Sequence, residues 1–257
     1  QFPSIEEALA WFRGAGQSEQ VHALPLDVTD RTAYARAADE AENRFGKIHV
    51  LCNNAGMGLV GPIKMTRFAD WDWGLSVMLG GVVNGLQIVI PRILKHGEGG
   101  HIVSTSSMAA IIPIPGTVIY TAAKGAVVAI SETLRGELAP DNIGVSAFCP
   151  GPVQTNIRET GKFRPALFQD SGLKEREKQL AERPTLELEF AEHVEDLAAK
   201  RLAGLFELVE QGAVHIAFAG LLGHEVPEVA DLRLANAVDA AEPLFQAVGV
   251  PRQVVVD

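Results

Sequence analysis

Tyr120 and Lys124 are the residues of this sequence whose types and spacing point most directly to chemistry. They lie four positions apart in the run Tyr-Thr-Ala-Ala-Lys, inside a segment whose apolar periodicity predicts a helix over residues 119–138. Residues four apart share one face of a helix, so the phenol and the ammonium can approach each other. At about 4 Å and an effective dielectric near 20, the ammonium would favour the phenolate by roughly 4 kcal/mol, about three pKa units at most. Such a tyrosine could give or take a proton near neutral pH.

Ser107 supplies a third polar group thirteen residues upstream of Tyr120. It ends the run Ile-Val-Ser-Thr-Ser-Ser, in which a β-rich pair is followed by hydroxyl side chains. This pattern is typical of a parallel strand that reaches the carboxyl edge of a sheet, where a site opens. A serine there could donate a hydrogen bond to a carbonyl or alcohol oxygen that the tyrosine also contacts. Considered alone, the tyrosine and lysine could also be a chance surface pair.

Strand-like and helix-like segments alternate along the middle of the chain. The predicted strands are residues 21–26, 48–52, 101–105 and 144–149, and the predicted helices are residues 31–45, 69–96 and 119–138. Strands that alternate with helices of this length predict parallel βαβ units with right-handed crossovers. The sequence therefore predicts an α/β fold.

Two polar or rigid loops follow predicted strands. They are the runs Asn53-Asn54-Ala55-Gly56 and Pro150-Gly151-Pro152-Val153-Gln154-Thr155. With Ser107, Tyr120 and Lys124 at their spacing, these loops make residues 21–155 resemble the short-chain dehydrogenase/reductases. Each motif is weak alone, but their combination is specific.

The resemblance implies a Rossmann-like doubly wound parallel sheet in three α/β/α layers, one domain over residues 1–257, and NAD or NADP as cofactor. It places these residues against the cofactor: Asp27, Val28, Asn53, Ala55, Gly56, Tyr120, Lys124, Pro150, Gly151, Val153 and Thr155. The residues themselves leave structural alternatives open. Asp27 could cap a turn, the Asn-Asn-Ala-Gly run could be a structural turn, and the proline-rich run could be an ordinary loop.

The glycine-rich turn of that family, Thr-Gly-x-x-x-Gly-x-Gly, is absent from this sequence. Gly14 and Gly16 follow a helical pattern over residues 5–14 and predict a helix stop instead. Since the first residue is Gln1, we expect a first βαβ unit of roughly 40 to 50 residues to precede it. No strand with a selective charged end distinguishes NAD from NADP.

Met78 is a second departure, because the resembled family usually has asparagine there, completing a Ser-Tyr-Lys-Asn tetrad. By that analogy the backbone carbonyl holds a water beside the lysine, so the relay could survive. Methionine cannot supply an amide, however, and activity could be reduced. Asn84 lies six residues on and is expected to point away from the face of position 78.

The charge and composition exclude several classes of protein. The 257 residues carry a formal charge of −10, with 47% hydrophobic and 21% charged residues, which is typical of a globular domain. Nucleic acid and anionic membranes need a basic partner, so neither is expected. No uninterrupted apolar run approaches a membrane span of about 20 residues, and we expect a cytoplasmic protein.

The cysteines and histidines indicate neither a disulfide nor a metal centre. Cys52 and Cys149 each end an apolar strand-like run, where buried thiols are expected rather than a disulfide. The seven histidines show no ligand spacing, so no metal is expected.

The segment after Thr155 is charged and irregular to about residue 188, and it is expected to form a lid over the substrate, a solvated loop being the alternative. Beyond it we expect a helix at 191–211, a strand at 214–218 and a helix at 227–248. An apolar seam in helix 69–96 suggests a homodimer or homotetramer, although a buried helix face would also explain it.

These features favour an NAD(P)-dependent oxidoreductase that interconverts a secondary alcohol and a ketone. Tyr120 would be the acid or base, Lys124 would lower its pKa, and Ser107 would hold the substrate oxygen. Apolar residues near them suggest an apolar or aryl substrate: Met108, Ile111, Ile114, Val118 and Ile119. Residues 155–166 faintly resemble bacterial aryl-alcohol Cα-dehydrogenases. A non-catalytic scaffold on the same fold is the alternative, and a sugar-nucleotide epimerase is disfavoured.

Overall fold

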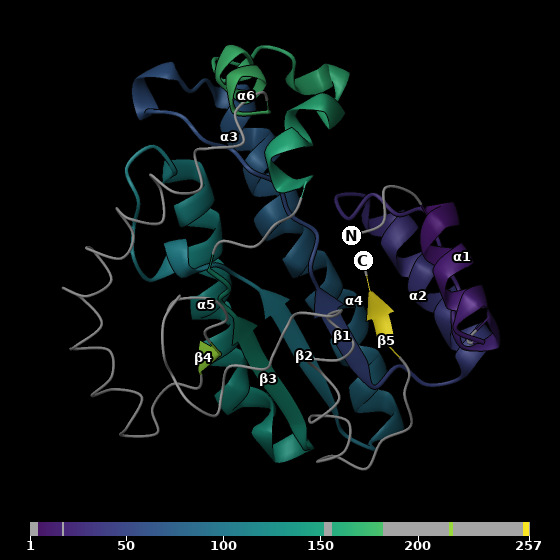
Figure 1. The fold of residues 1–257 in the computed structure, drawn as a ribbon. Coiled ribbons are helices and arrows are strands. Elements are labelled where there is room, and N and C mark those ends of the chain that lie inside the picture. The colour runs from purple at the N-terminus through teal and green to yellow at the C-terminus, as the bar shows by residue number, and fades with distance from the viewer. Residues whose placement is uncertain (1–4, 17, 152–155, 182–215, 218–253, 257) are drawn as a thin grey trace, which may run out of the picture.

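A computed structural model describes residues 5–16, 18–151, 156–181, 216–217 and 254–256 (Figure 1). Its strands form one five-stranded sheet in the order β4-β3-β2-β1-β5, in which every neighbouring pair is parallel. The strands are β1 Val50–Asn53, β2 Gly100–Thr105, β3 Ile143–Phe148, β4 Ile216–Ala217 and β5 Val254–Val256. The predicted Rossmann-like α/β fold is therefore confirmed.

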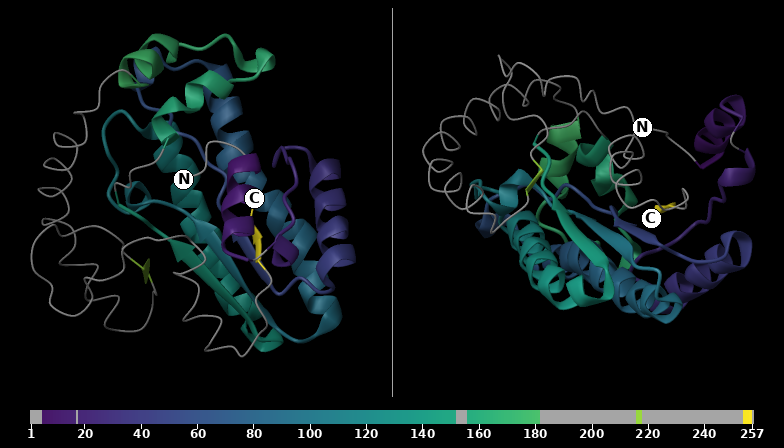
Figure 2. Two further views of the ribbon diagram at one scale, coloured as in Figure 1. Left: turned by 45° about the vertical axis from the view of Figure 1, so that its right-hand side comes forward. Right: turned by 90° about the horizontal axis from the view of Figure 1, so that it is seen from below.

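One face of the sheet is covered by α2 (Arg31–Phe45), α4 (Gly81–His96) and α5 (Val118–Leu138), as the right-hand view of Figure 2 shows. Their apolar faces and the strands share one core. Its buried members are Ala38, Ala41, Ile48, Leu51, Val82, Leu86, Val89, Ile93, Ile102, Val127, Leu138, Ile143 and Val145. This packing fixes where each strand ends, and so where the polar loops lie.

Helix ends follow the capping residues of the sequence. The Asp30 carboxylate accepts hydrogen bonds from the backbone N–H groups of Thr32 and Ala33, which starts α2 at its predicted position. Gly46 ends this helix with a φ of 91°, and Gly97 ends α4 with a φ of 68°. Only glycine adopts such angles without strain, which explains the sharp stops.

The predicted helix at 69–96 is confirmed, but it contains a π-turn. Helix α3 (Phe68–Leu75) continues through η3 (Ser76–Gly80), which is π-helical, into α4. Met78 lies in this π-turn and is fully buried. π-turns are rare in proteins, and those that occur are often found at functional sites.

The whole stretch Phe68–His96 is long and apolar enough to cross a membrane by length and composition. Here it packs along the sheet (Figure 1), and its seam residues Val82, Leu86, Val89 and Ile93 belong to the core. A buried helix face thus accounts for the seam, and the oligomer stays a prediction.

Residues 21–26 are not a strand, so that prediction is wrong. The strand next to β1 at this end of the sheet is β5, which pairs with β1 from Val50↔Val254 to Cys52↔Val256. A strand needs a neighbour for its backbone hydrogen bonds, and residues 21–26 have no such neighbour among the described strands. They connect η1 (Ser18–Gln20) to α2 without regular secondary structure.

The remaining predicted elements are matched where the structure describes them. Helix α1 (Ile5–Gly14) is confirmed, and the strand predicted at 214–218 is represented by β4, which pairs with Ala147 and Phe148. The helices predicted at 191–211 and 227–248 lie outside the described residues. Neither cysteine forms a disulfide; Cys149 is buried and Cys52 half-buried.

We predict that Gly85→Ala destabilises the fold, because α4 approaches β1 closely at this glycine. A Cβ there would lie 2.6 Å from the Tyr34 hydroxyl and would also clash with the Asn53 side chain. The free energy of unfolding should fall by about 1 to 3 kcal/mol, measured by urea denaturation. The control is Gly136→Ala on the exposed face of α5, where no described atom lies within 4 Å. In Gly136→Ala the free energy of unfolding should rise by up to about 1 kcal/mol, because alanine favours a helix more than glycine does. An equal loss of stability in both variants would contradict the close packing at Gly85.

Candidate active site

The carboxyl ends of three strands meet at one edge of the sheet and are joined there by hydrogen bonds. Asn54, just after β1, accepts a 3.0 Å bond from the Thr105 hydroxyl at the end of β2. Met108, after β2, donates its backbone N–H to the Pro150 carbonyl after β3, also at 3.0 Å. The loops that the sequence singled out are therefore neighbours.

Helix α5 is fastened to the end of β2 by two reciprocal hydrogen bonds. The Lys124 ammonium nitrogen donates to the Thr105 carbonyl at 2.6 Å, and the Ser106 hydroxyl donates to the Lys124 carbonyl at 2.7 Å. Lys124 is only 3% exposed. A buried ammonium needs such a partner, and the carbonyl at the strand end supplies it.

Ser107 and Tyr120 lie within hydrogen-bonding reach of each other, and their predicted contact with one substrate oxygen stays a prediction. The Ser107 oxygen accepts a 3.1 Å bond from the backbone N–H of Ala109, which starts the short helix η4 (Met108–Ala110). This contact uses a lone pair and leaves the hydroxyl hydrogen available to the phenol side. Lys124 lies one turn on, with its nitrogen 5.9 Å from the centre of the Tyr120 ring.

Burial dominates the electrostatics of this group. It raises the pKa of Tyr120 above its ordinary value, and the hydrogen bond from Ser107 opposes this effect. It lowers the pKa of Lys124 from 10.5 to about 8. The prediction that Lys124 lowers the pKa of Tyr120 is not met in this structure, because withdrawal from water disfavours both charged forms.

Cys149 belongs to the same group, although the sequence suggested only a buried thiol. It is fully buried, and it interacts with Ser106, with the Ser107 backbone and with Lys124. Burial raises the pKa of its thiol, so it is present as the neutral S–H. The sequence could have indicated this position, because Cys149 follows β3 and the carboxyl ends of neighbouring parallel strands meet at one edge of the sheet.

The Asn-Asn-Ala-Gly turn has its first residue in the protein interior and its last residue beside Lys124. Asn53 is 2% exposed, and its amide bridges the hydroxyls of Tyr34 and Ser104 at 3.5 and 3.3 Å. Gly56 lies close to Lys124, whose nitrogen would be 3.6 Å from a Cβ at that position. The predicted cofactor contacts of Asn53, Ala55 and Gly56 stay predictions.

Asp27 and Val28 have structural partners. The Asp27 carboxylate accepts from the backbone and the hydroxyl of Thr29 at 2.9 and 2.8 Å, which is the capping alternative. The Val28 carbonyl accepts a 2.8 Å bond from the Asn84 amide, which also accepts from Arg31. Asn84 therefore ties α4 to this turn.

The remaining predicted cofactor residues follow β3. Pro150 and Gly151 are described, and Pro150 is held by Met108, whereas Val153 and Thr155 lie outside the described residues. Met78 packs in an apolar cluster with six other buried residues. They are Met57, Leu59, Trp73, Ile119, Ala123 and Leu173.

Comparison with known families decides the classification. A family model described as short chain dehydrogenase matches residues 4–163 of this chain. The chain belongs to the short-chain dehydrogenase family. As a member it is an oxidoreductase, in agreement with the arrangement of Ser107, Tyr120 and Lys124.

Relatives of this short-chain dehydrogenase include a C alpha-dehydrogenase of Sphingobium sp., 34% identical over 242 residues that cover 94% of this chain and 76% of that protein. A 3-oxoacyl-[acyl-carrier-protein] reductase, FabG, of Thermotoga maritima is 35% identical over 144 residues, which cover 56% of this chain and 58% of that protein. A crystal structure from Burkholderia phymatum, a short chain dehydrogenase/reductase in complex with NAD, is 30% identical with a TM-score of 0.64. That match covers 83% of this chain and 76% of the other.

The residues of this dehydrogenase fit one half of a nicotinamide cofactor. The Lys124 nitrogen would lie 3.6 Å from a Cβ at Gly56 and lies 5.9 Å from the centre of the Tyr120 ring, so Gly56, Lys124 and Tyr120 are the residues that would hold the ribose. The glycine-rich turn for the pyrophosphate is not part of this sequence. The described residues would thus hold the nicotinamide end of such a cofactor.

The segment expected to form the lid begins as ordered helical turns. It comprises η6 (Asn156–Phe163), η7 (Ala166–Phe168) and α6 (Lys174–Ala181). Thr160 accepts a 3.0 Å bond from the Gly58 backbone, two residues beyond the Asn-Asn-Ala-Gly turn. A Cβ on Gly58 would meet the Ile157 carbonyl at 2.8 Å, so the segment lies directly on this loop.

Arg164 fastens this segment to α3. Its guanidinium is 2% exposed and pairs with Glu177 and, at 3.0 Å, with Asp70. It also lies 4.4 Å from the centre of the Trp73 ring. Asp70 in turn accepts from Ser171 at 2.5 Å and from the Gly172 backbone. The segment is therefore held by a buried ionic cluster.

We expect Arg164→Met to destabilise the protein by about 3 to 5 kcal/mol, because it leaves two buried carboxylates without their cation. The control Lys162→Met removes an exposed ion pair with Glu159 and should cost less than about 1 kcal/mol. Urea denaturation measures both. A similar small loss in the two variants would show that the cluster does not hold the segment.

Lys124 should make stability depend on pH. Its folded pKa of about 8 lies below the ordinary 10.5, so the folded state binds fewer protons in that window. The protein is therefore most stable, as far as Lys124 is concerned, above pH 10.5. This stability is lost as the pH falls from 10.5 through the folded pKa of about 8. Between about pH 7.5 and 9.5, the wild type should gain roughly 2 kcal/mol relative to Lys124→Met. Identical pH dependence in the two proteins would contradict a depressed Lys124 pKa.

Proposed function

We propose that this protein uses NAD or NADP to interconvert a secondary alcohol and a ketone. The observation that supports this most strongly is the convergence of Ser107, Tyr120 and Lys124 at the carboxyl edge of the sheet. A phenol and a buried amine one helical turn apart, with a serine hydroxyl within hydrogen-bonding reach of the phenol, suit proton transfer to a carbonyl oxygen. Membership of an oxidoreductase family supports the same chemistry.

In the reducing direction, Tyr120 gives its proton to the ketone oxygen while Ser107 donates a hydrogen bond to that oxygen. The nicotinamide cofactor, when bound, supplies the hydride for this direction and accepts it in the reverse one. Since burial keeps Tyr120 protonated, the site is prepared to act as an acid. Oxidation needs the phenolate, which a nearby positive charge would have to stabilise.

Lys124 is suited to return a proton to Tyr120 after turnover. An amine with a pKa of about 8 gains and loses its proton close to neutral pH, whereas an ordinary lysine holds it. Its hydrogen bond to the Thr105 carbonyl orients the nitrogen, and Gly56 lies beside it. The same amine would hold a cofactor ribose.

The substrate is proposed to be an apolar or aryl alcohol or ketone. Ile111 and Ile114 are half-buried and Val118 is exposed, so these three side chains are available to line a site. Met108 and Ile119 are buried and belong to the interior. The similarity to a C alpha-dehydrogenase supports an aryl alcohol, whereas the similarity to a 3-oxoacyl reductase supports a linear ketone.

A non-catalytic scaffold is the second candidate, and Met78 is the observation that favours it. Its thioether fills an apolar cluster where the family usually has an amide, so the relay lacks one side chain. The partners remain part of the proposal: a small-molecule substrate, a homodimer or homotetramer, and neither nucleic acid nor membrane. A cytoplasmic location is proposed on the same basis.

Replacing Tyr120 by Phe tests the proposal. The variant should lose about 10²- to 10⁴-fold in turnover of an aryl ketone with NADH or NADPH, because it lacks the proton donor, and should keep its fold by circular dichroism. Ser131→Ala is the matched control, since it removes one hydroxyl from the same helix, bonded only to the Val127 carbonyl among the described groups. It should retain activity.

Fluorescence titration with NADH and NADPH separates the two candidates. Saturable binding together with turnover supports the enzyme. Full activity of Tyr120→Phe would refute the assigned role, and failure of the wild type to bind either nucleotide would favour the scaffold.

A further inference from the structure

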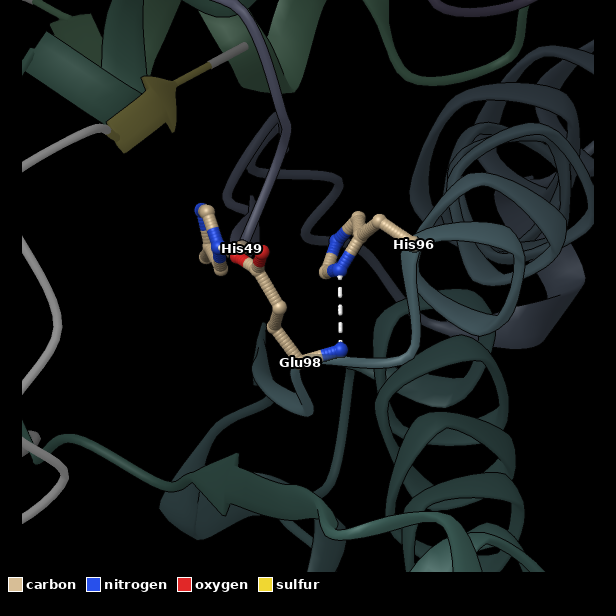
Figure 3. A group of neighbouring side chains, drawn as sticks. All are labelled: His49, His96 and Glu98. Carbon is tan, nitrogen blue, oxygen red and sulfur yellow. Dashed lines mark hydrogen bonds and ion pairs between the residues drawn. The ribbon is translucent and has the colours of Figure 1, made fainter.

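His49, His96 and Glu98 lie together at the edge of the sheet opposite to the candidate active site (Figure 3). His49 directly precedes β1, His96 ends α4, and Glu98 lies in the loop before β2. One potential ligand atom from each lies within 4.8 Å of the others. The sequence could not reveal this group, because its two histidines are far apart along the chain and predicted no metal.

His96 is arranged as metal-binding histidines commonly are. Its Nε2 makes a 2.9 Å hydrogen bond to the Ile48 carbonyl, which can only accept, so the proton is on Nε2. The lone pair is therefore on Nδ1, which accepts a 3.2 Å hydrogen bond from the Glu98 backbone N–H (Figure 3), and a cation would take the place of that N–H. A histidine whose second nitrogen donates to a backbone carbonyl has its tautomer and orientation fixed for a metal ion.

His49 presents its Nε2 to the same point. This nitrogen lies 2.9 Å from a Glu98 carboxylate oxygen, and the side chain is 11% exposed. The other nitrogen, Nδ1, is buried without a hydrogen-bond partner among the described residues. Because a carboxylate can only accept, His49 Nε2 carries the proton in this contact, and a cation would bind at Nε2 in place of that proton.

Glu98 can adjust its position. It lies between Gly97 and Gly99, which have φ angles of 68° and 77°, and its side chain is 50% exposed. One of its oxygens pairs with Lys47, and the other faces His49. Ligands around a tetrahedral zinc ion are about 3.4 Å apart, so no separation in this group must shorten by more than about 1.4 Å.

We propose that His49, His96 and Glu98 bind a divalent transition-metal ion of the zinc type. Two imidazoles and one carboxylate are a ligand set that Zn²⁺ favours, and water would complete the tetrahedron. The ion would join the start of β1, the end of α4 and the loop before β2. Because these lie far from Tyr120 along the strands, its role would be structural.

Metal titration of the tag-free full-length chain, after chelator treatment, tests this site. Calorimetry with Zn²⁺ should give one ion per chain, and Co²⁺ should give a tetrahedral visible absorption band. His49→Gln, His96→Gln and Glu98→Gln should each weaken binding at least about tenfold. Zn²⁺ should also raise the thermal midpoint of the wild type and not that of Glu98→Gln.

The matched control is His22→Gln. His22 forms a 2.6 Å pair with Glu40 that no third ligand joins among the described residues, so this variant should bind Zn²⁺ like the wild type. Glu98→Gln changes a half-exposed loop side chain and serves if a histidine variant fails to fold. Absence of Zn²⁺ binding by the wild type, or equal affinity of wild type and Glu98→Gln, would overturn the proposal.

Discussion

The two hydrogen bonds between Lys124 and the end of β2 are the constraint on which the candidate site depends. The ammonium donates to the Thr105 carbonyl, and the Ser106 hydroxyl donates to the Lys124 carbonyl. Together they fix the first turns of α5 against β2, and Ser107 is the second residue after that strand. Tyr120, on the same face of the helix, is thereby held beside that serine. The same contacts withdraw the amine from water, and its low pKa follows from this burial.

The fold and the position of the site could be predicted from the sequence because both depend on local signals. Alternating periodicity gave β1, β2 and β3 within two residues of their observed bounds, and Asp30 and Gly46 gave the limits of α2. Parallel strands must end at a common edge, which brought the loops after them together. Four-residue spacing placed Tyr120 and Lys124 on one face, and that too was a local property.

The predictions that were wrong concerned features that depend on residues distant in the sequence or on the loss of hydration. Residues 21–26 have a strand-like composition, but no neighbour pairs with them, whereas β5 comes from the far end of the sequence. Charge spacing predicted that Lys124 would acidify Tyr120, but it could not weigh the loss of hydration that both groups suffer. From the sequence alone, Asn84 was assessed only as a replacement for the missing amide at position 78. Its hydrogen bond to the Val28 carbonyl joins residues 56 positions apart, which become neighbours only in the folded protein.

If burial governs the protonation of Tyr120 and Lys124, the ionisation of Tyr120 must show it. The chain has two tyrosines, so Tyr34→Phe leaves Tyr120 as the only phenol, and its absorbance near 295 nm can be followed against pH while circular dichroism monitors folding. In the absence of nucleotide we expect Tyr120 to ionise above the ordinary tyrosine pKa of about 10. Ionisation at or below that value in the folded protein would contradict it, since a lysine-stabilised phenolate would then control the site.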